Sequence, residues 1–336
     1  AAAVARRSFG QRPPQAGRAG MLYRDLIPDR LGGRYIASHI RIPDGGPVPD
    51  YVHFHKIRFQ LIFVKDGWVR VAYEDQGEPL LLQRGDCVSV MMENRIEYLA
   101  LLVGLNKIGV TAGLINTNLT GRPLSHCVSV THSKKCVFGS EVGDAISEIS
   151  SELSLDEGDD FYVVPDGANL NGCNWAKNLS EQASYAAKDN PPDTLSTTLG
   201  ETCLYIFTSG TTGLPKAAVL SNRRYLTAAD LSAQAGLKLT EKDRLYICLP
   251  LYHATGLLLG VGSSFCSGAS MFIRRKFSAS NFLPEVRDNN CTGFIYIGEL
   301  CRYLTNSEPK ADDHKNPIRV MMGNGLRPDI WKSFKQ

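Results

Sequence analysis

Helix and strand patterns alternate from about residue 86 to the end of the chain, and few folds are compatible with this order. Short apolar runs of strand length are separated by longer segments in which apolar residues recur at helical spacing. Consecutive strands that are joined by helices run parallel, because a parallel pair needs a long crossover connection. The sequence therefore predicts an α/β domain with parallel strands.

The expected elements can be placed along this alternation. Helices are expected at Asn94–Ile108, Val142–Leu153, Asn222–Gly236, Ser280–Asn289 and Gly298–Asn306. Strands are expected at Lys135–Phe138, Phe161–Val164, Leu204–Phe207, Leu245–Cys248, Ser270–Arg274 and Arg319–Met322. The uncharged segment 245–273 has the length of a membrane span, but Pro250, His253 and several Gly and Ser residues interrupt it. We interpret it as a buried strand, a loop and a helix, and we expect no transmembrane helix.

The segment before residue 86 has a different, β-rich pattern. Strands are expected at Arg34–Ile42, Phe59–Val64 and Trp68–Tyr73. The last two are joined by the hairpin signal Lys65–Gly67. Residues 1–20 contain Arg, Ala, Gly and Pro but no acidic residue, so we expect a disordered tail there. A mitochondrial presequence, or translated sequence upstream of a start at Met21, is the alternative.

Composition excludes one functional class and indicates a compartment. The 336 residues suffice for two domains, and the net charge of +3 is small. Basic residues are scattered and form no stripe with aromatic residues, so we expect no binding to nucleic acid. The nine cysteines are dispersed without a CxxC pair, which indicates free, mostly buried thiols in a reducing, intracellular compartment.

The segment YIFTSGTTGLPKAAV, residues 205–219, contains the strongest functional signal. An apolar strand ends here in a loop that contains Thr208, Ser209, Gly210, Thr211, Thr212, Gly213 and, shortly afterwards, Lys216. Glycines allow tight turns that bring backbone N–H groups close to a ligand, hydroxyls add short donors, and Lys216 adds a mobile positive charge. The loop therefore suits the phosphates of ATP, although many such loops only connect a strand to a helix.

The full string resembles the phosphate-binding loop of the AMP-forming adenylate family, which includes acyl-CoA synthetases, luciferases and peptide-synthetase adenylation domains. Within this family, further segments resemble the fatty acid transport proteins, also called very-long-chain acyl-CoA synthetases. These segments are LPLYHATG (249–256), IRRKFSASNF (273–282), YIGELCRYL (296–304), GNGLRPDIW (323–331) and the run 91–127. The resemblance covers about residues 86–336 and implies an incomplete N-terminal domain of an adenylate-forming enzyme over residues 88–336.

This resemblance implies ATP-dependent ligation of a long- or very-long-chain fatty acid to coenzyme A, and fatty-acid uptake. The carboxylate would attack the α-phosphate of ATP, release pyrophosphate and form an acyl-adenylate, from which the thiol of coenzyme A would displace AMP. ATP, Mg²⁺ and coenzyme A are the implied cofactors, and a long-chain fatty acid is the implied partner. The family is associated with the endoplasmic reticulum, plasma membrane or peroxisome, which leaves peripheral membrane association open here.

The resemblance also implies a nucleotide site. Residues 208–213 and Lys216 would hold the β- and γ-phosphates, with Mg²⁺ bridging phosphate oxygens. Gly323, Asn324 and Gly325 occupy the place where the family's backbone packs on adenine.

A substrate site is implied in the same way. Tyr252 and His253 would lie near the acyl carboxylate, with a core aromatic beside a hydrogen-bonded histidine as the alternative. Gly256 and Gly260 would leave room for the acyl chain, and close helix packing is the equal alternative.

A second resemblance concerns the N-terminal segment. His53 and His55 are two residues apart and would share one face of a strand. With Gln60 and Gly67 they match the first metal-binding motif of cupins, so residues 22–87 resemble part of a cupin barrel. A divalent metal would bind poorly to His53, His55 and Gln60, because Gln60 is a neutral ligand and the second motif is missing. The expected segment, residues 21–87, is a partial all-β cupin-like unit in a natural or an artificial fusion.

The resemblance ends at Gln336, whereas the family continues with a Thr–Glu motif, a ribose-binding aspartate and a C-terminal lid that carries a lysine. We therefore expect that the chain alone binds ATP weakly and does not complete adenylation. Three functions are left open: an incomplete fatty acid–CoA ligase, a catalytically incompetent nucleotide- or lipid-binding protein, and a cupin metalloprotein with an inert appendage.

Overall fold

The computed structural model describes residues 15–16, 22–25, 38–41, 82–167, 169–208 and 213–335. The chain divides into two compact units, residues 1–67 and 68–336. The described residues of the first unit form a three-stranded antiparallel sheet with β2 in the middle. Its strands are β1 (Gln15–Ala16), β2 (Leu22–Asp25) and β3 (Ser38–Arg41). The strand predicted around residues 34–42 contains β3, whereas the strands and hairpin predicted at 59–73 lie outside the described residues.

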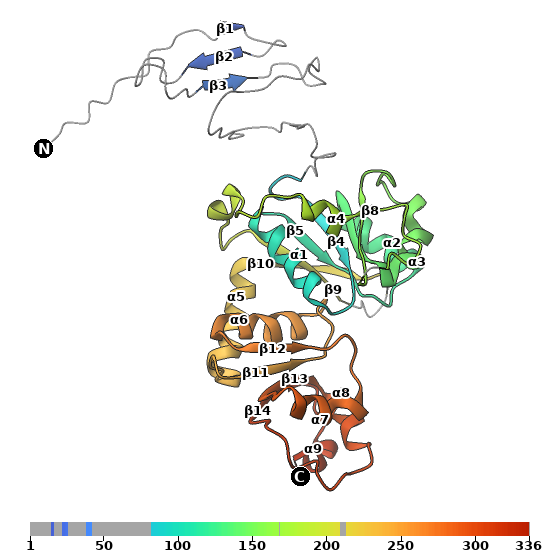
Figure 1. The fold of residues 1–336 in the computed structure, drawn as a ribbon, viewed down its shortest axis with the longest axis vertical. Helices are drawn as coiled ribbons and strands as arrows, with labels where there is room; N and C mark the ends of the chain where they lie inside the picture. Colours follow the sequence, from blue (N-terminus) through green and yellow to red (C-terminus); the bar gives the residue numbers. More distant parts are fainter. Residues whose placement is uncertain are drawn as a thin grey trace, which may run out of the picture. The chain divides into compact units, whose positions relative to one another are not determined.

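The second unit contains two sheets with helices packed around them (Figure 1). The larger sheet has seven strands in the order β10-β9-β5-β4-β6-β7-β8, and only β10 is antiparallel to its neighbour. Its strands are β4 (Cys87–Met91), β5 (Thr111–Leu114), β6 (Lys135–Gly139), β7 (Phe161–Val164), β8 (Lys177–Asn178), β9 (Thr202–Thr208) and β10 (Lys216–Ser221).

The smaller sheet is entirely parallel. Its four strands have the order β12-β11-β13-β14. They are β11 (Arg244–Ile247), β12 (Ser270–Ile273), β13 (Gly293–Ile297) and β14 (Val320–Asn324).

Helices provide most of the crossovers between these parallel strands, because two parallel neighbours need a long connection. The α-helices are α1 (Ile96–Lys107), α2 (Gly121–Val130), α3 (Gly143–Ile149), α4 (Leu179–Ser184), α5 (Asn222–Leu231), α6 (Ser263–Ser267), α7 (Ala279–Asp288), α8 (Gly298–Thr305) and α9 (Pro328–Lys335). Two π-helical segments, η6 (Ser232–Leu237) and η7 (Thr255–Gly262), extend α5 and precede α6. Short 3₁₀ segments are η3 (Ser140–Val142), η4 (Ser150–Glu152) and η5 (Pro192–Ser196).

The core of the larger sheet follows from the period of two along its strands. On β4, Val88 and Val90 pack into one apolar cluster together with Leu102 of α1. Met91 packs into a second cluster together with Leu124 of α2. The first cluster continues through buried residues of β11 and β13, so the two sheets share one core around α1.

The predicted α/β class is confirmed, and every helix and strand predicted after residue 86 has a counterpart. The segment 245–273 is a strand, a loop and a helix, as predicted, followed by β12. No helix in the described part of the chain is long and apolar enough to cross a membrane. The predicted free thiols are also confirmed, since all nine cysteines are unpaired and eight of them are buried.

One unpredicted strand changes the interpretation of the functional loop. β10 pairs antiparallel with β9, with Lys216 opposite Thr208. The connection between them is therefore a hairpin loop, not the strand-to-helix connection considered above. The segment KAAVLS is hard to identify as a strand because alanine has little strand propensity.

Candidate nucleotide-binding site

The site lies at the edge where the parallel strands of the larger sheet end. β5 and β9 are neighbours with Leu114 opposite Ile206, so the chain leaves both strands at the same edge. Thr208, the last residue of β9, is therefore level with the loop that follows β5. In open α/β sheets, ligands bind in the crevice outside the carboxyl ends of the strands. The hairpin loop after Thr208 starts at such a position.

The Lys216 ammonium is accessible among the described residues of the hairpin. Lys216 is exposed and makes no ion pair with any residue that the structure describes. Thr208 is also exposed, and its hydroxyl donates to the Lys216 carbonyl over 3.4 Å. A Cβ placed on Gly213 would meet no atom within 4 Å, so the backbone there is accessible. Residues 209–212, which include the predicted Ser209, Gly210, Thr211 and Thr212, lie outside the described residues.

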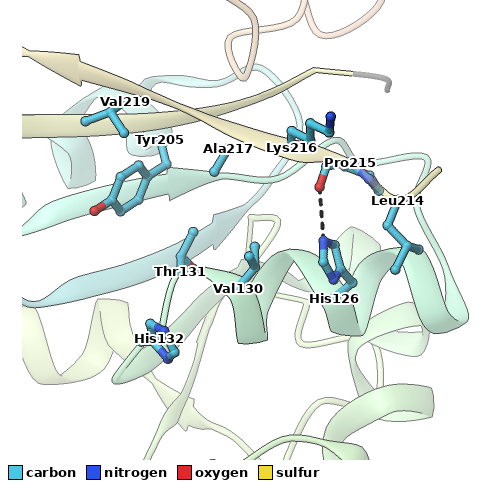
Figure 2. A pocket seen from close by; sticks show the side chains of 10 residues that line it. All are labelled: His126, Val130, Thr131, His132, Tyr205, Leu214, Pro215, Lys216, Ala217 and Val219. Carbon is cyan, nitrogen blue, oxygen red and sulfur yellow. Dashed lines mark hydrogen bonds between the residues drawn. The ribbon is translucent and has the colours of Figure 1, made fainter. Parts of the chain in front are cut away.

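Helix α2 supports the hairpin from behind. The Nε2 atom of His126 lies 3.0 Å from the carbonyl oxygen of Pro215. Because a carbonyl oxygen only accepts, Nε2 is the nitrogen that carries the hydrogen. Figure 2 shows His126 reaching up from α2 to Pro215, while the amino group of Lys216 points away from the helix. A cavity of about 530 Å³ lies between α2 and the hairpin, lined largely by apolar side chains that include Val130 and Ala217.

Tyr252 and His253 lie in the loop between β11 and η7. Tyr252 is buried, which raises the pKa of its hydroxyl, and a hydrogen bond with Thr117 opposes that rise. Thr117 follows β5, so this contact brings Tyr252 to the same sheet edge as Thr208. The His253 ring lies 4.8 Å from the Tyr252 ring. The residue is exposed, and the desolvation of its inner part lowers the pKa of its imidazole, which favours the neutral form.

The two glycines beside this loop have packing partners. A Cβ on Gly256 would lie 2.6 Å from the Pro250 carbonyl oxygen, so the glycine allows η7 to pack against the preceding loop. A Cβ on Gly260 would make ordinary contact, at 3.4 Å, with Ile247. The structure thus gives Gly256 the packing role that was one of its two alternatives, while space for an acyl chain stays a prediction.

Gly323, Asn324 and Gly325 lie at the carboxyl edge of the smaller sheet. β14 ends at Asn324, which pairs with Ile297 at the end of β13. A Cβ on Gly323 would overlap the carbonyl oxygen of Tyr296, so only glycine fits between the two strands. Contact with adenine stays a prediction, but the three residues have the edge position that such a contact requires.

Asn94 joins the two sheets at this edge, and sequence reasoning did not identify it as a site residue. Its buried side-chain amide donates to the carbonyl oxygens of Leu249 (2.9 Å) and Arg274 (3.1 Å). Its Oδ1 accepts from the backbone N–H of Leu251 at 2.8 Å. Asn94 therefore holds the loop that carries Tyr252 against the end of β4. The only sequence signal is an Asn directly after an apolar strand.

Ion pairs fill the other part of the same edge. Arg275 binds Glu93 through Nε (2.6 Å) and Asp166 through Nη2 (2.9 Å), and Arg95 lies 3.4 Å from Glu141. The hydrogen bond from Arg275 lowers the pKa of the Asp166 carboxyl. Glu93, Glu141 and Asp166 follow β4, β6 and β7, so these strand ends are occupied by neutralised charges.

The predicted cupin ligands His53, His55 and Gln60 lie outside the described residues. Within the described ranges, no cluster of three or more His, Cys, Asp or Glu side chains could hold a metal ion. The cupin resemblance thus stays a prediction.

Solved structures with the same fold are adenylate-forming enzymes. The inhibitor-bound N-terminal domain of FACL13 from Mycobacterium tuberculosis superposes with a TM-score of 0.63 at 20% identity, over 75% of this chain and 60% of that chain. ATP-bound MatB from Rhodopseudomonas palustris gives a TM-score of 0.64 at 22% identity, over 77% of this chain and 48% of that chain. The fold is therefore that of the N-terminal domain of adenylate-forming enzymes.

The sequence agrees with this fold. The model of the family described as AMP-binding enzyme matches residues 80–336, and the chain belongs to this family. Long-chain fatty acid transport protein 1 of Bos taurus is 39% identical over 254 residues, which are 75% of this chain and 38% of that protein. Medium/long-chain-fatty-acid–CoA ligase FadD6 of Mycobacterium tuberculosis is 35% identical over 283 residues, 81% of this chain and 45% of that protein. The chain thus spans less than half of the length of these relatives.

Proposed function

We propose that this chain binds Mg²⁺–ATP through Thr208, residues 209–213 and Lys216, and that it serves the activation of long-chain fatty acids. The observation that carries the proposal is the exposed ammonium of Lys216, which pairs with no carboxylate that the structure describes, on a hairpin at the carboxyl edge of a parallel sheet. An exposed cation beside glycines and hydroxyls attracts a polyanion, because backbone N–H groups and the ammonium both favour negative charge.

The residues around the hairpin fit this ligand. The backbone at Gly213 is accessible, and the ion pairs of the neighbouring edge use up the carboxylates that would repel phosphate. Magnesium bound to ATP keeps several waters and takes ligands from the phosphates, so it needs no cage of protein side chains. The absence of a three-residue metal cluster among the described residues is compatible with this role.

The fatty acid is proposed to bind beside Tyr252 and His253. Desolvation lowers the pKa of the His253 imidazole and favours its neutral form, and a neutral imidazole can donate a hydrogen bond to a carboxylate without forming an ion pair. Gly323, Asn324 and Gly325 would contact the adenine, and coenzyme A would accept the acyl group. The relatives named as fatty acid transport proteins and fatty-acid–CoA ligases support a long-chain acyl substrate. They are compatible with a fatty acid that is taken from a membrane.

Isothermal titration of Mg²⁺–ATP into the 336-residue chain tests the nucleotide site. Lys216→Ala removes a charged hydrogen-bond donor, so we expect ATP binding to weaken by about ten- to a hundredfold. Lys134→Ala is the matched control, since Lys134 is an exposed lysine outside the hairpin. Equal affinity of the Lys216→Ala variant and the control would contradict the proposal.

ATP–pyrophosphate exchange separates the candidate activities. Exchange that depends on palmitate would support a fatty acid–CoA ligase. ATP binding without exchange would support a nucleotide-binding protein that lacks catalysis. Failure of the wild-type chain to bind ATP would reject both.

A further inference from the structure

We infer that His126 is a positioning residue for the proposed phosphate site, which it serves through Pro215 without touching the nucleotide. This inference rests on the proposed function. Neither the phosphate-loop motif nor the predicted substrate residues include His126, which lies far away in the sequence on α2.

The first step concerns the backbone between Pro215 and Lys216. The ring of Pro215 fixes its φ, and the following peptide bond is planar. The ψ angle of Pro215 is therefore the only soft torsion between the ring and the Cα atom of Lys216. A hydrogen bond to the Pro215 carbonyl oxygen orients the whole peptide plane, and the bond from His126 has an ordinary length of 3.0 Å. His126 thus restrains the torsion that precedes Lys216, on the side of the hairpin where the β9–β10 ladder begins.

The second step concerns the rigidity of the donor. Leu124, Cys127 and Val128 anchor α2 in the second core cluster, the one that contains Met91 of β4. His126 is half-buried between these anchors and the hairpin. A donor on a packed helix holds its partner more precisely than a donor on a loop.

The third step concerns what else restrains the hairpin. A cavity of about 530 Å³ lies between α2 and the hairpin, and Ala217 of β10 packs beside it against the cluster that holds α2. The pairing of Lys216 with Thr208 in the β9–β10 ladder also restrains the hairpin, and the Thr208 hydroxyl adds only a long 3.4 Å bond. Figure 2 shows that the Lys216 amino group points away from α2, so His126 can hold the hairpin without blocking the proposed ligand.

Three variants test the inference. His126→Ala removes the donor, whereas His126→Gln can replace it, because the Gln side-chain amide donates from a similar position. His132→Asn is the matched control. His132 lines the same cavity but makes no hydrogen bond with the hairpin among the described residues. It has φ = 49°, which Asn tolerates.

Two measurements are made on each variant: the affinity for Mg²⁺–ATP, and amide hydrogen exchange at Lys216 and Ala217 without nucleotide. For His126→Ala we expect ATP affinity to fall by about three- to tenfold, as one neutral hydrogen bond allows, and exchange at both amides to become faster. His126→Gln should recover most of both losses, and His132→Asn should resemble the wild type. A further variant, His126→Leu, restores volume without a hydrogen-bond donor, so recovery by Leu as well as by Gln would show that His126 merely fills space.

The outcomes separate this inference from the proposed function. If wild-type ATP binding is strong and His126→Ala binds equally well, the positioning role is overturned while the phosphate site stands. If the wild-type chain binds no ATP, the proposed function fails, and with it the role of His126 at a phosphate site. The amide exchange then reports only whether the hydrogen bond orders the hairpin; unchanged exchange in His126→Ala would reject that as well.

Discussion

The two sheets of the second unit are stabilised in different ways. In the larger sheet, the inner strands β4, β5 and β7 are buried along their whole length, while the outer strands β8 and β10 are half-exposed or exposed. In the smaller sheet, only β11 and β13 are largely buried, and the outer strands β12 and β14 are mostly half-exposed. Apolar burial can hold the larger sheet, because it scales with the area removed from water. The smaller sheet buries less apolar area, so a further interaction stabilises it.

This interaction is made by a buried carboxylate at the amino ends of the strands of the smaller sheet. Asp243, just before β11, has a side chain that is only 5% exposed. Arg319, just before β14, donates to its two oxygens over 2.8 and 2.6 Å. Thr292, just before β13, donates over 2.7 Å. One charge thus ties three strands together at the edge opposite the candidate site, which leaves the carboxyl edge free for function.

The largest expected effect is in the larger sheet. Phe138 of β6 is fully buried and stacks on Trp175, with ring centroids 5.5 Å apart. We expect Phe138→Ala to lower the free energy of unfolding by about 4 kcal/mol, because it removes apolar contacts and leaves a cavity. Urea denaturation measures the change. Val103→Ala on the exposed side of α1 is the control, and an equal loss in both variants would argue against apolar burial as the source.

A smaller loss is expected in the smaller sheet. Arg319→Ala leaves the Asp243 carboxylate buried without its cation, a change that costs about 3–5 kcal/mol for a fully buried pair. Since Arg319 is itself 43% exposed, water can replace part of its role, and we expect a loss of about 2–3 kcal/mol. Arg302→Ala is the matched control, because Arg302 pairs with Glu299 on the exposed surface of α8. Similar urea midpoints for both variants would show that Asp243 does not need its partner.

Acid should separate the two mechanisms. The hydrogen bond from Arg319 holds the pKa of the Asp243 carboxyl well below its ordinary value. A lowered native pKa stabilises the fold above the unfolded pKa of about 3.9, and this stabilisation is lost as the pH falls through the native pKa. The cost of Arg319→Ala should therefore shrink between pH 7 and pH 3, whereas the cost of Phe138→Ala should persist. Urea midpoints of both variants at the two pH values test this, and parallel changes would contradict it.

Sequence reasoning identified many of the alternating elements of both sheets because their apolar periods are local, but it did not list β4, α2 or β13. It also located the loop before Lys216, because glycines and hydroxyls express their chemistry in adjacent residues. It could not identify Asp243 with Arg319 or His126 with Pro215, since these pairs are 76 and 89 residues apart and only the fold joins them. β10 was missed for a local reason, as its alanines give a weak strand signal.

The smallest of these effects concerns the junction between the two sheets. Asn94 is buried and makes three hydrogen bonds to the backbone of the smaller sheet's connecting loops. Asn94→Ala leaves these backbone groups without their partner, so we expect a loss of about 1–2 kcal/mol. Asn118→Ala serves as the control, because Asn118 follows β5 and is exposed.

The more informative result is where the loss appears. Because Asn94 joins elements of both sheets, its removal should loosen the loops at the junction while the apolar core that the two sheets share stays packed. Amide exchange should then become faster around Leu251 and Arg274 but stay slow in β4 and β13, which lie inside the shared core. Since Leu251 precedes the proposed substrate residues Tyr252 and His253, the variant should also weaken fatty-acid binding more than ATP binding. Uniform acceleration across both sheets would mean that Asn94 stabilises the shared core as a whole, and not the junction loops alone.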